Sequence, residues 1–150
     1  MSIGRREFIA GLGGAAAWPF VARAQQGERA RRIGVLSPFD ESDPVVKARI
    51  SAFIQALADL GWTDGRNVRI DLRWHGADAD QTRALAQELV GLQPDIILAN
   101  GTPATVAHQR EMRTIPIVFV NASDPVASGL VERLNQPGGK VTGFATFEMA

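Results

Sequence analysis

The sequence predicts an α/β fold in which a five-stranded, mainly parallel sheet carries helices on both faces. Short apolar runs, which are typical of buried strands, alternate along the chain with stretches whose apolar residues recur every three or four positions. One predicted strand alternates apolar and polar residues instead, as expected at a sheet edge. The resulting order is β-α-β-α-β-α-β-α-β, and strands that alternate with helices in this way favour parallel pairing.

The residues before the first predicted strand read as an export signal. Arg5-Arg6 provide a positive start, residues 8–21 are modestly apolar and rich in Gly and Ala, and Ala22-Arg23-Ala24 fits a cleavage site. The apolar stretch is too short and too rich in glycine to span a bilayer stably. The alternative is a buried Gly/Ala-rich helix that happens to contain two arginines.

The arginine pair and the residues after it, Glu7-Phe8-Ile9, resemble the twin-arginine motif, although Gly4 stands where a Ser or Thr is usual. We therefore expect residues 1–24 to be a twin-arginine signal peptide that is cleaved after about Ala24. Residues 25–31 would be a flexible lead-in, the protein would be periplasmic, and the twin-arginine export machinery would be a partner.

The composition narrows the function classes further. The 150 residues include 16 basic and 16 acidic side chains, so the net charge is zero and nothing favours nucleic acid or an anionic membrane surface. Removing residues 1–24 takes away three arginines and one glutamate, which leaves 13 basic and 15 acidic residues. The chain has no cysteine and two histidines, so it offers no thiolate metal site, no lipoprotein anchor and little material for any other metal site.

The first predicted strand and helix follow the lead-in. Ile33 to Leu36 is a short apolar run that Ser37-Pro38 ends, which indicates a buried strand. A helix is expected to begin at Asp43-Pro44 and to end at Gly61. Its apolar stripe consists of Val46, Ile50, Phe53, Ile54, Leu57 and Leu60.

The predicted edge strand covers residues 68–74. It alternates Val68, Ile70, Leu72 and Trp74 with Arg69, Asp71, Arg73 and His75. Arg69 and Arg73 should therefore share one solvated face. Trp74 could belong to the core or to a pocket wall. Residues 80–92 carry leucines at helical spacing and predict the next helix.

The rest of the chain supplies three strands and two helices. Strands are predicted at 95–99, 115–120 and 141–147, and helices at 103–112 and 125–134. Pro116 is compatible with the start of its strand, where no ladder donor is needed. Pro137-Gly138-Gly139 predicts a turn before the last strand.

Ligands of such sheets bind outside the carboxyl ends of the strands. Here several of these ends carry hydroxyl or amide side chains. Thr102 and Ser123 can donate hydrogen bonds, and Asp124 can accept one from a cationic group. The turn Asn100-Gly101-Thr102 opens a helix, whose amino end favours an anion such as a carboxylate or a phosphate.

Other interpretations of these residues remain open at this stage. Thr102 and Asp124 could simply cap the helices that follow them. Asp40, Asp43 and Asp124 could form a metal or phospho-acceptor cluster, and an exported α/β hydrolase that uses Asp40 or Asp124 with a metal is the alternative function. No nucleotide-binding fingerprint and no G-x-S-x-G nucleophile motif is present. His75 and His108 are expected to be solvated or partly packed rather than catalytic.

Four segments together resemble one family. They are the export signal, "FIQALADLGWTDGRNVRIDLRW", "LAQELVGLQPDIILANGTPATVA" and "TIPIVFVNASDPVASGLVERLNQPGGKVTGF". They are similar to the N-terminal lobe of ABC-transporter substrate-binding proteins of the tryptophan/tyrosine type, whose fold is that of type I periplasmic binding proteins. The resemblance covers residues 32–150, which would form a single Rossmann-like lobe, half of such a receptor. The second lobe is absent from the sequence, which we interpret as a fragment or the product of a truncated gene.

The resemblance implies a non-enzymatic receptor that holds a small polar solute, such as an amino acid, between two lobes and presents it to a membrane permease. It implies no catalytic residue, metal or cofactor. The implied carboxylate site lies near residues 101–105 and the implied ammonium site near Asp124. The implied ligand-binding residues are Ser37, Asn100, Gly101, Thr102, Thr105, Asn121, Ser123 and Asp124.

Overall fold

The computed structural model describes residues 29–38, 40–111 and 113–146. The predicted export signal lies outside these residues. The elements, in chain order, are β1 (Arg31–Ser37), α2 (Pro44–Asp59), β2 (Val68–Trp74), α3 (Ala79–Gly91), β3 (Ile96–Asn100), α4 (Thr102–Glu111), β4 (Ile117–Ser123) and β5 (Val141–Thr146). The predicted strands are all present, with ends that differ by at most three residues, and β1 begins inside the predicted lead-in.

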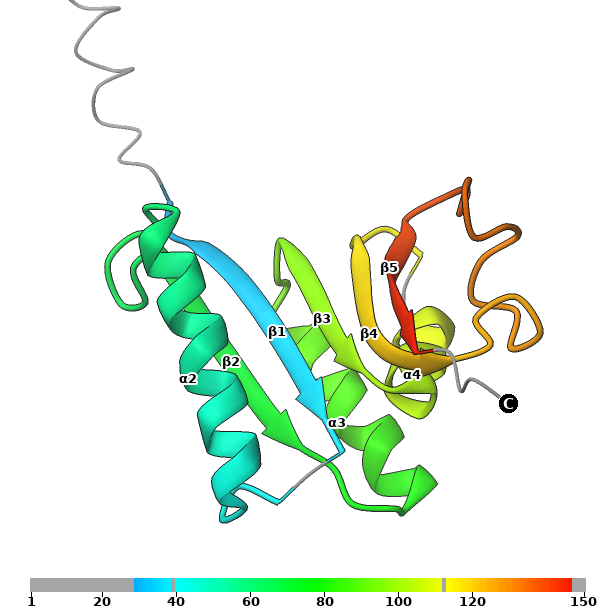
Figure 1. Ribbon diagram of the computed structural model, residues 1–150, viewed down its shortest axis with the longest axis horizontal. Helices are drawn as coiled ribbons and strands as arrows, with labels where there is room; N and C mark the ends of the chain where they lie inside the picture. Colours follow the sequence, from blue (N-terminus) through cyan, green and yellow to red (C-terminus); the bar gives the residue numbers. More distant parts are fainter. Residues whose placement is uncertain (1–28, 39, 112, 147–150) are drawn as a thin grey trace, which may run out of the picture.

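The five strands form one sheet in the order β2-β1-β3-β4-β5, and every neighbouring pair is parallel (Figure 1). The predicted parallel sheet is therefore confirmed, and β2 is an edge strand as its alternating sequence predicted. After β1 the chain moves outward to β2 and then returns to the other side of β1 to form β3. This reversal makes the carboxyl ends of β1 and β3 the topological switch point, where ligands bind in open α/β sheets.

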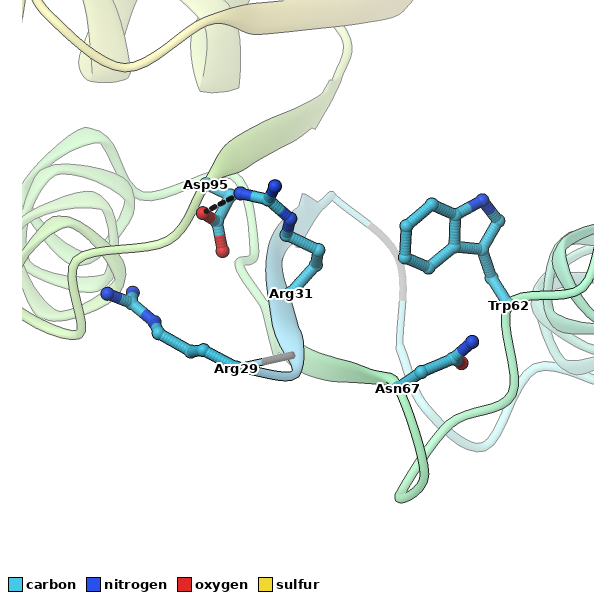
Figure 2. A pocket seen from close by; sticks show the side chains of 5 residues that line it. All are labelled: Arg29, Arg31, Trp62, Asn67 and Asp95. Carbon is cyan, nitrogen blue, oxygen red and sulfur yellow. Dashed lines mark hydrogen bonds and ion pairs between the residues drawn. The ribbon is translucent and has the colours of Figure 1, made fainter. Parts of the chain in front are cut away.

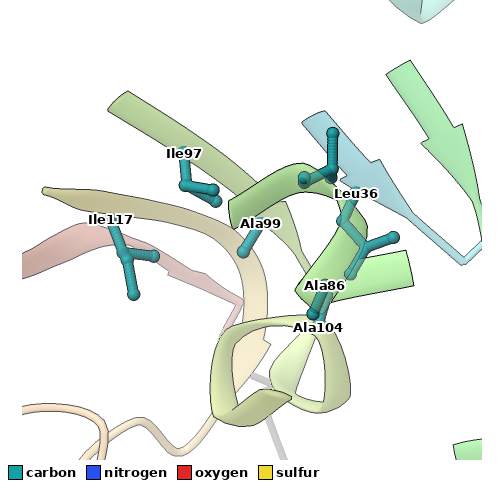
Figure 3. Close-up of a cluster of buried hydrophobic side chains, with 7 residues drawn as sticks. Leu36, Ala86, Ile97, Ala99, Ala104 and Ile117 are labelled. Carbon is teal, nitrogen blue, oxygen red and sulfur yellow. The ribbon is translucent and has the colours of Figure 1, made fainter. Parts of the chain in front are cut away.

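One face of the sheet is covered by two helices. Figure 1 shows α3 and α4 behind the sheet, and their small residues allow close packing on it. Figure 3 shows the cluster that results, in which each side chain is at most 3% exposed. It consists of Leu36, Ala86, Leu89, Ile97, Ala99, Ala104 and Ile117. This cluster anchors the strands whose ends carry the candidate site.

The opposite face carries α2, which Figure 1 shows in front of the sheet. The Asp43 carboxylate caps this helix by accepting a hydrogen bond from the Val45 amide, and Pro44 occupies its first turn, as predicted. The predicted apolar stripe faces the sheet only in part. Val46 is buried, whereas Leu60 is 76% exposed because it lies at the C-cap, beyond the last helical turn.

The helix predicted at 125–134 is wrong, because this segment forms a series of turns. Gly129 takes a left-handed backbone angle (φ 68°), which ends any helical run that starts at Pro125. Leu130 and Val131 instead turn inward and pack with Phe119 of β4. The sheet therefore has three helices among the described residues rather than the predicted four, and none of the three is long and apolar enough to span a membrane.

Candidate functional site

A line of amide and hydroxyl side chains crosses the sheet at the switch point. The Asn100 side chain, at the end of β3, donates from Nδ2 to the Ser37 Oγ of β1 over 3.2 Å. The Asn121 Nδ2 of β4 donates to the Asn100 Oδ1 over 3.0 Å. Three neighbouring strands are thus joined by their side chains at the carboxyl edge of the sheet. We call these three residues the amide line.

The backbone at Asn121 is irregular, and this irregularity directs its side chain. The pairing of β4 with β5 slips between Val120 and Ala122, which marks a β-bulge. Asn121 lies in the bulge with a left-handed backbone (φ 53°), a conformation that Asn tolerates better than most residues. Its amide group therefore points along the edge toward Asn100. Left-handed backbone conformations at residues other than glycine, such as that of the exposed Asn121, concentrate at functional sites.

A second link joins the start of α4 to the end of β4. The Thr102 hydroxyl accepts a hydrogen bond from the Ser123 amide over 3.2 Å and donates to the Ser123 carbonyl oxygen over 3.4 Å. Gly101, with φ 91°, makes the turn that precedes the helix. Thr102 is thus the first residue of α4 and does not cap it. Its hydroxyl fixes β4 against the amino end of the helix, which carries partial positive charge.

Asp124 follows β4 on the exposed rim of this edge. Its carboxylate accepts a hydrogen bond from the Ala127 amide over 3.0 Å, and its carbonyl oxygen accepts one from the Ser128 amide over 3.0 Å. The helix that Asp124 was expected to cap is absent, and the Asp124 carboxylate instead stabilises the turn formed by the residues after it. Only one carboxylate oxygen of Asp124 is engaged among the described residues, and the side chain faces solvent.

Two of the predicted ligand-binding residues are buried instead of exposed. Ser37 is 1% exposed, and its hydroxyl accepts the bond from Asn100. Thr105 is fully buried, and its hydroxyl donates to the Gly101 carbonyl oxygen over 2.8 Å. These two buried side chains therefore hold neighbouring residues of the carboxyl edge in place through hydrogen bonds. Exposed side chains at the same edge are those of Asn121, Ser123 and Asp124.

A hollow of about 530 Å³ lies beside the amide line, at the carboxyl ends of β1 and β2. Trp74 forms part of its wall, so the pocket-wall interpretation of this residue is the correct one. The other lining residues are Pro38, Asp40, Glu41, His75, Gly76 and Gln81. The sequence does not show that Trp74 and Gln81 line the same hollow, because only the packing of α3 behind β2 brings these residues together.

The two histidines are more buried than predicted. His75 is 3% exposed and His108 is 1% exposed, and the His75 Nδ1 lies 3.0 Å from the Thr82 hydroxyl. Burial, together with a smaller effect of nearby His75, lowers the pKa of His108 from 6.5 to about 4. Both ring nitrogens of His108 lack a hydrogen-bond partner among the described residues. At neutral pH the burial of His108 and the lack of hydrogen-bond partners for its ring favour the uncharged imidazole.

Arg69 and Arg73 share one face of β2, as the alternation predicted, but this face is the one toward α3 and both residues are engaged in ion pairs. Arg73 binds the Glu88 carboxylate of α3 over 2.7 Å. Arg69 lies 3.4 Å from Asp71, which also pairs with Arg32 over 3.1 Å. These charges connect the edge strand to its neighbours and take no part in the amide line.

Comparison with known proteins assigns the chain to a family. A family model described as "ABC transporter substrate binding protein" matches residues 32–150. The chain belongs to this family. The predicted resemblance is therefore confirmed over the stretch for which it was made.

Individual proteins that are similar to this chain agree with the family assignment. A tyrosine-binding protein from Clostridioides difficile is 35% identical over 120 residues, which cover 80% of this chain and 34% of that protein. The ligand-free, open structure of a substrate-binding protein with adhesive properties from Clostridium difficile superimposes with a TM-score of 0.71 at 33% identity, covering 79% of this chain and 39% of that one.

A third relative is an ABC domain from Streptococcus pneumoniae that was solved in complex with L-Trp. It superimposes with a TM-score of 0.68 at 28% identity, over 77% of this chain and 38% of that one. The chain thus spans little more than a third of the length of each of these three relatives. The structural matches support the predicted fold of one lobe.

Family membership decides between the two function classes that the sequence left open. Substrate-binding proteins of ABC transporters are not enzymes, so the hydrolase alternative is set aside. Across residues 29–38, 40–111 and 113–146, no group of three or more His, Cys, Asp or Glu residues could hold a metal ion, and Asp40 and Asp43 bind backbone amides beside them.

Proposed function

We propose that the carboxyl edge of this sheet forms one wall of a solute-binding cleft in a periplasmic ABC uptake system. The observation that carries the proposal is the amide line of Ser37, Asn100 and Asn121, which lies at the topological switch point. The two side-chain amides of this line, Asn100 and Asn121, offer donors and acceptors at fixed positions, which suits a small polar solute. In this proposal the facing wall belongs to a second lobe, as in the type I receptors that the sequence resembles.

The solute that fits this edge best is an amino acid. Its carboxylate would lie at the start of α4, near Gly101 and Thr102, where the helix dipole favours negative charge. Its ammonium group would lie near Asp124, whose carboxylate is exposed and has one oxygen available among the described residues. L-tyrosine and L-tryptophan are the first candidates, because one relative is named a tyrosine-binding protein and another was solved with L-Trp.

The partners follow from the same proposal. A loaded receptor would deliver its solute to a membrane permease of the transporter. The predicted signal at residues 1–24 would send the protein to the periplasm through the twin-arginine export machinery and would be cleaved after about Ala24. These steps rest on the sequence motif and on family membership.

The substitution Asp124→Asn tests the ammonium site, because Asn keeps an oxygen for the Ala127 amide and tolerates the left-handed backbone (φ 38°). Loss of a charge-assisted hydrogen bond of about 1.4 kcal/mol or more should weaken L-tryptophan binding roughly tenfold. Indole-3-propionate, which lacks the ammonium group, should bind the variant and the unmodified protein equally. Asp80→Asn, on the exposed surface of α3, is the matched control.

Calorimetric titration of the full chain with both compounds provides the measurement. Full affinity of the Asp124→Asn protein for L-tryptophan would remove Asp124 from the site. Equal losses for L-tryptophan and indole-3-propionate would mean that the substitution disturbs the edge as a whole rather than an ammonium contact.

A further inference from the structure

A second hollow lies at the opposite edge of the sheet, where the strands begin. It has a volume of about 340 Å³ and is lined by Arg29, Arg31, Trp62, Asn67 and Asp95. Figure 2 shows these side chains arranged around one opening, with Trp62 on one side and Arg31 and Asp95 on the other. They come from the start of β1, the α2–β2 connection and the residue before β3.

This hollow continues into an apolar one beneath the end of α2. The second part, of about 470 Å³, shares Arg31, Trp62 and Asp95 with the first. Its remaining walls are aliphatic and consist of Ile33, Leu57, Val68 and Ile96. We call the two parts together the amino-edge groove. The groove has a polar mouth and an apolar interior.

The mouth carries a net positive charge. Asp95 is its one carboxylate among the described lining residues, and it accepts hydrogen bonds from the Arg32 amide over 2.8 Å and from Arg31 over 3.2 Å. These bonds hold the pKa of Asp95 below its usual value, so this carboxylate stays ionised and engaged. Arg29 forms no ion pair with any carboxylate among the described residues. The mouth thus has two arginines, Arg29 and Arg31, and one carboxylate whose two oxygens already accept hydrogen bonds.

Trp62 is held in place as an exposed aromatic wall. Its amide donates to the Leu57 carbonyl oxygen over 2.8 Å, and Gly61 makes the preceding turn with φ 89°. The Trp62 residue is nevertheless 41% exposed. A large aromatic side chain at the mouth of an aliphatic groove offers both stacking area and apolar contact to a ligand.

We propose that the amino-edge groove binds a small amphipathic anion, an alkyl or aryl carboxylate. Its apolar body lies between Leu57 and Ile96, with Trp62 against it, and its carboxylate faces Arg29 and Arg31. This ligand matches the groove in both charge and polarity. A zwitterionic amino acid fits less well, because both oxygens of Asp95 already accept hydrogen bonds and the two arginines would repel an ammonium group. The site is therefore separate from the cleft wall under Proposed function.

Octanoate and octanol provide matched probes, since they differ mainly in the anionic group. We expect octanoate, added to the full chain labelled with nitrogen-15, to shift the Trp62 indole and Asn67 side-chain signals in a saturable way. The Trp62 signal is assigned with a Trp62→Phe variant. Octanol should shift the same signals with an affinity at least about fivefold weaker, because it lacks the attraction of the arginines.

Arg29→Glu reverses one charge at the mouth without breaking any ion pair among the described residues. We expect it to weaken octanoate binding roughly fivefold or more and to leave octanol binding unchanged. Arg49→Glu, on the exposed surface of α2, makes the same change in net charge at a distance from the groove and should leave both affinities unchanged.

Three results would overturn the proposal. One is the absence of a saturable shift at Trp62 and Asn67 with octanoate. Another is equal affinity for octanoate and octanol, which would indicate an apolar surface without anion selectivity. The third is an equal effect of Arg29→Glu and Arg49→Glu, which would indicate a response to overall charge. None of these results depends on amino-acid binding at the carboxyl edge, so the two proposals can fail separately.

Discussion

The two edges of this sheet are built from the same five strands but differ in chemistry. At the carboxyl edge, neutral amide and hydroxyl groups bond to one another across β1, β3 and β4. At the amino edge, arginines and Asp95 surround an opening that leads into an aliphatic groove. Under the two proposals, these edges are separate recognition surfaces of one α/β lobe, one for a polar solute and one for an amphipathic anion.

The topology of the sheet explains where the amide line and the amino-edge groove lie. The chain reverses its direction of winding between β1 and β3, so the loops after these strands diverge and leave room for side chains between them. At the amino edge the room arises differently. There α2 ends at Asp59, and Gly61 makes a turn after it. This turn places Trp62 beside the starts of β1 and β3.

The largest expected difference between the edges is their response to acid. The pKa of His108, in α4 next to the carboxyl edge, falls from 6.5 to about 4 on folding because of burial. As the pH falls below 6.5 the unfolded chain takes up this proton first, so stability is full above pH 6.5 and is lost progressively down to about pH 4. The loss should reach roughly 3 kcal/mol in the free energy of unfolding.

Urea unfolding between pH 7 and pH 4 measures this loss, and His108→Leu is the variant that should remove it. Leucine has no titratable group and needs no hydrogen bonds, whereas both ring nitrogens of His108 lack a partner among the described residues. An identical pH dependence in the two proteins would contradict the assignment. Asp95 at the amino edge adds its own loss only below pH 3.8, since its pKa is lowered from that value.

A smaller effect on stability is expected from Asn121→Gly. Glycine accepts the left-handed backbone of this position without strain, which offsets the lost side-chain bond to Asn100. We expect the free energy of unfolding to change by no more than about 0.5 kcal/mol. Affinity for L-tryptophan should nevertheless fall severalfold, while octanoate binding at the amino edge stays the same.

Calorimetry with L-tryptophan and octanoate separates these outcomes for Asn121→Gly. A large loss of stability would mean that the amide line is mainly a structural device. A loss of affinity for both ligands would mean that the two edges are not independent.

Much of the fold could be predicted from the sequence, because its local patterns agree with its tertiary structure. The apolar runs of β1, β3 and β4 and the alternation of β2 each correspond to a position in the sheet. The segment after β4 misled the prediction because Pro125 and the apolar residues after it look like a helix start. The left-handed Gly129 and the inward packing of Leu130 outweighed this local preference.

The candidate site could be predicted less completely. The strand-end rule located the amide line and Thr102, but it could not distinguish exposed residues from supporting ones. The family resemblance implies Thr105 as a ligand-binding residue, yet its hydroxyl donates to the Gly101 carbonyl oxygen at the start of α4. The amino-edge groove and the burial of His108 depend on contacts between residues far apart in the sequence, and no local pattern signals them.

A single titration tests the central claim that the carboxyl edge is the solute-binding wall. The full chain, labelled with nitrogen-15, is titrated with L-tryptophan, and signal shifts are compared at the two edges. Saturable shifts at Asn100, Gly101 and Asn121, with no change at Arg31 and Asn67, are the predicted result. Shifts confined to the amino edge, or no saturable shift at the amide line, would contradict it.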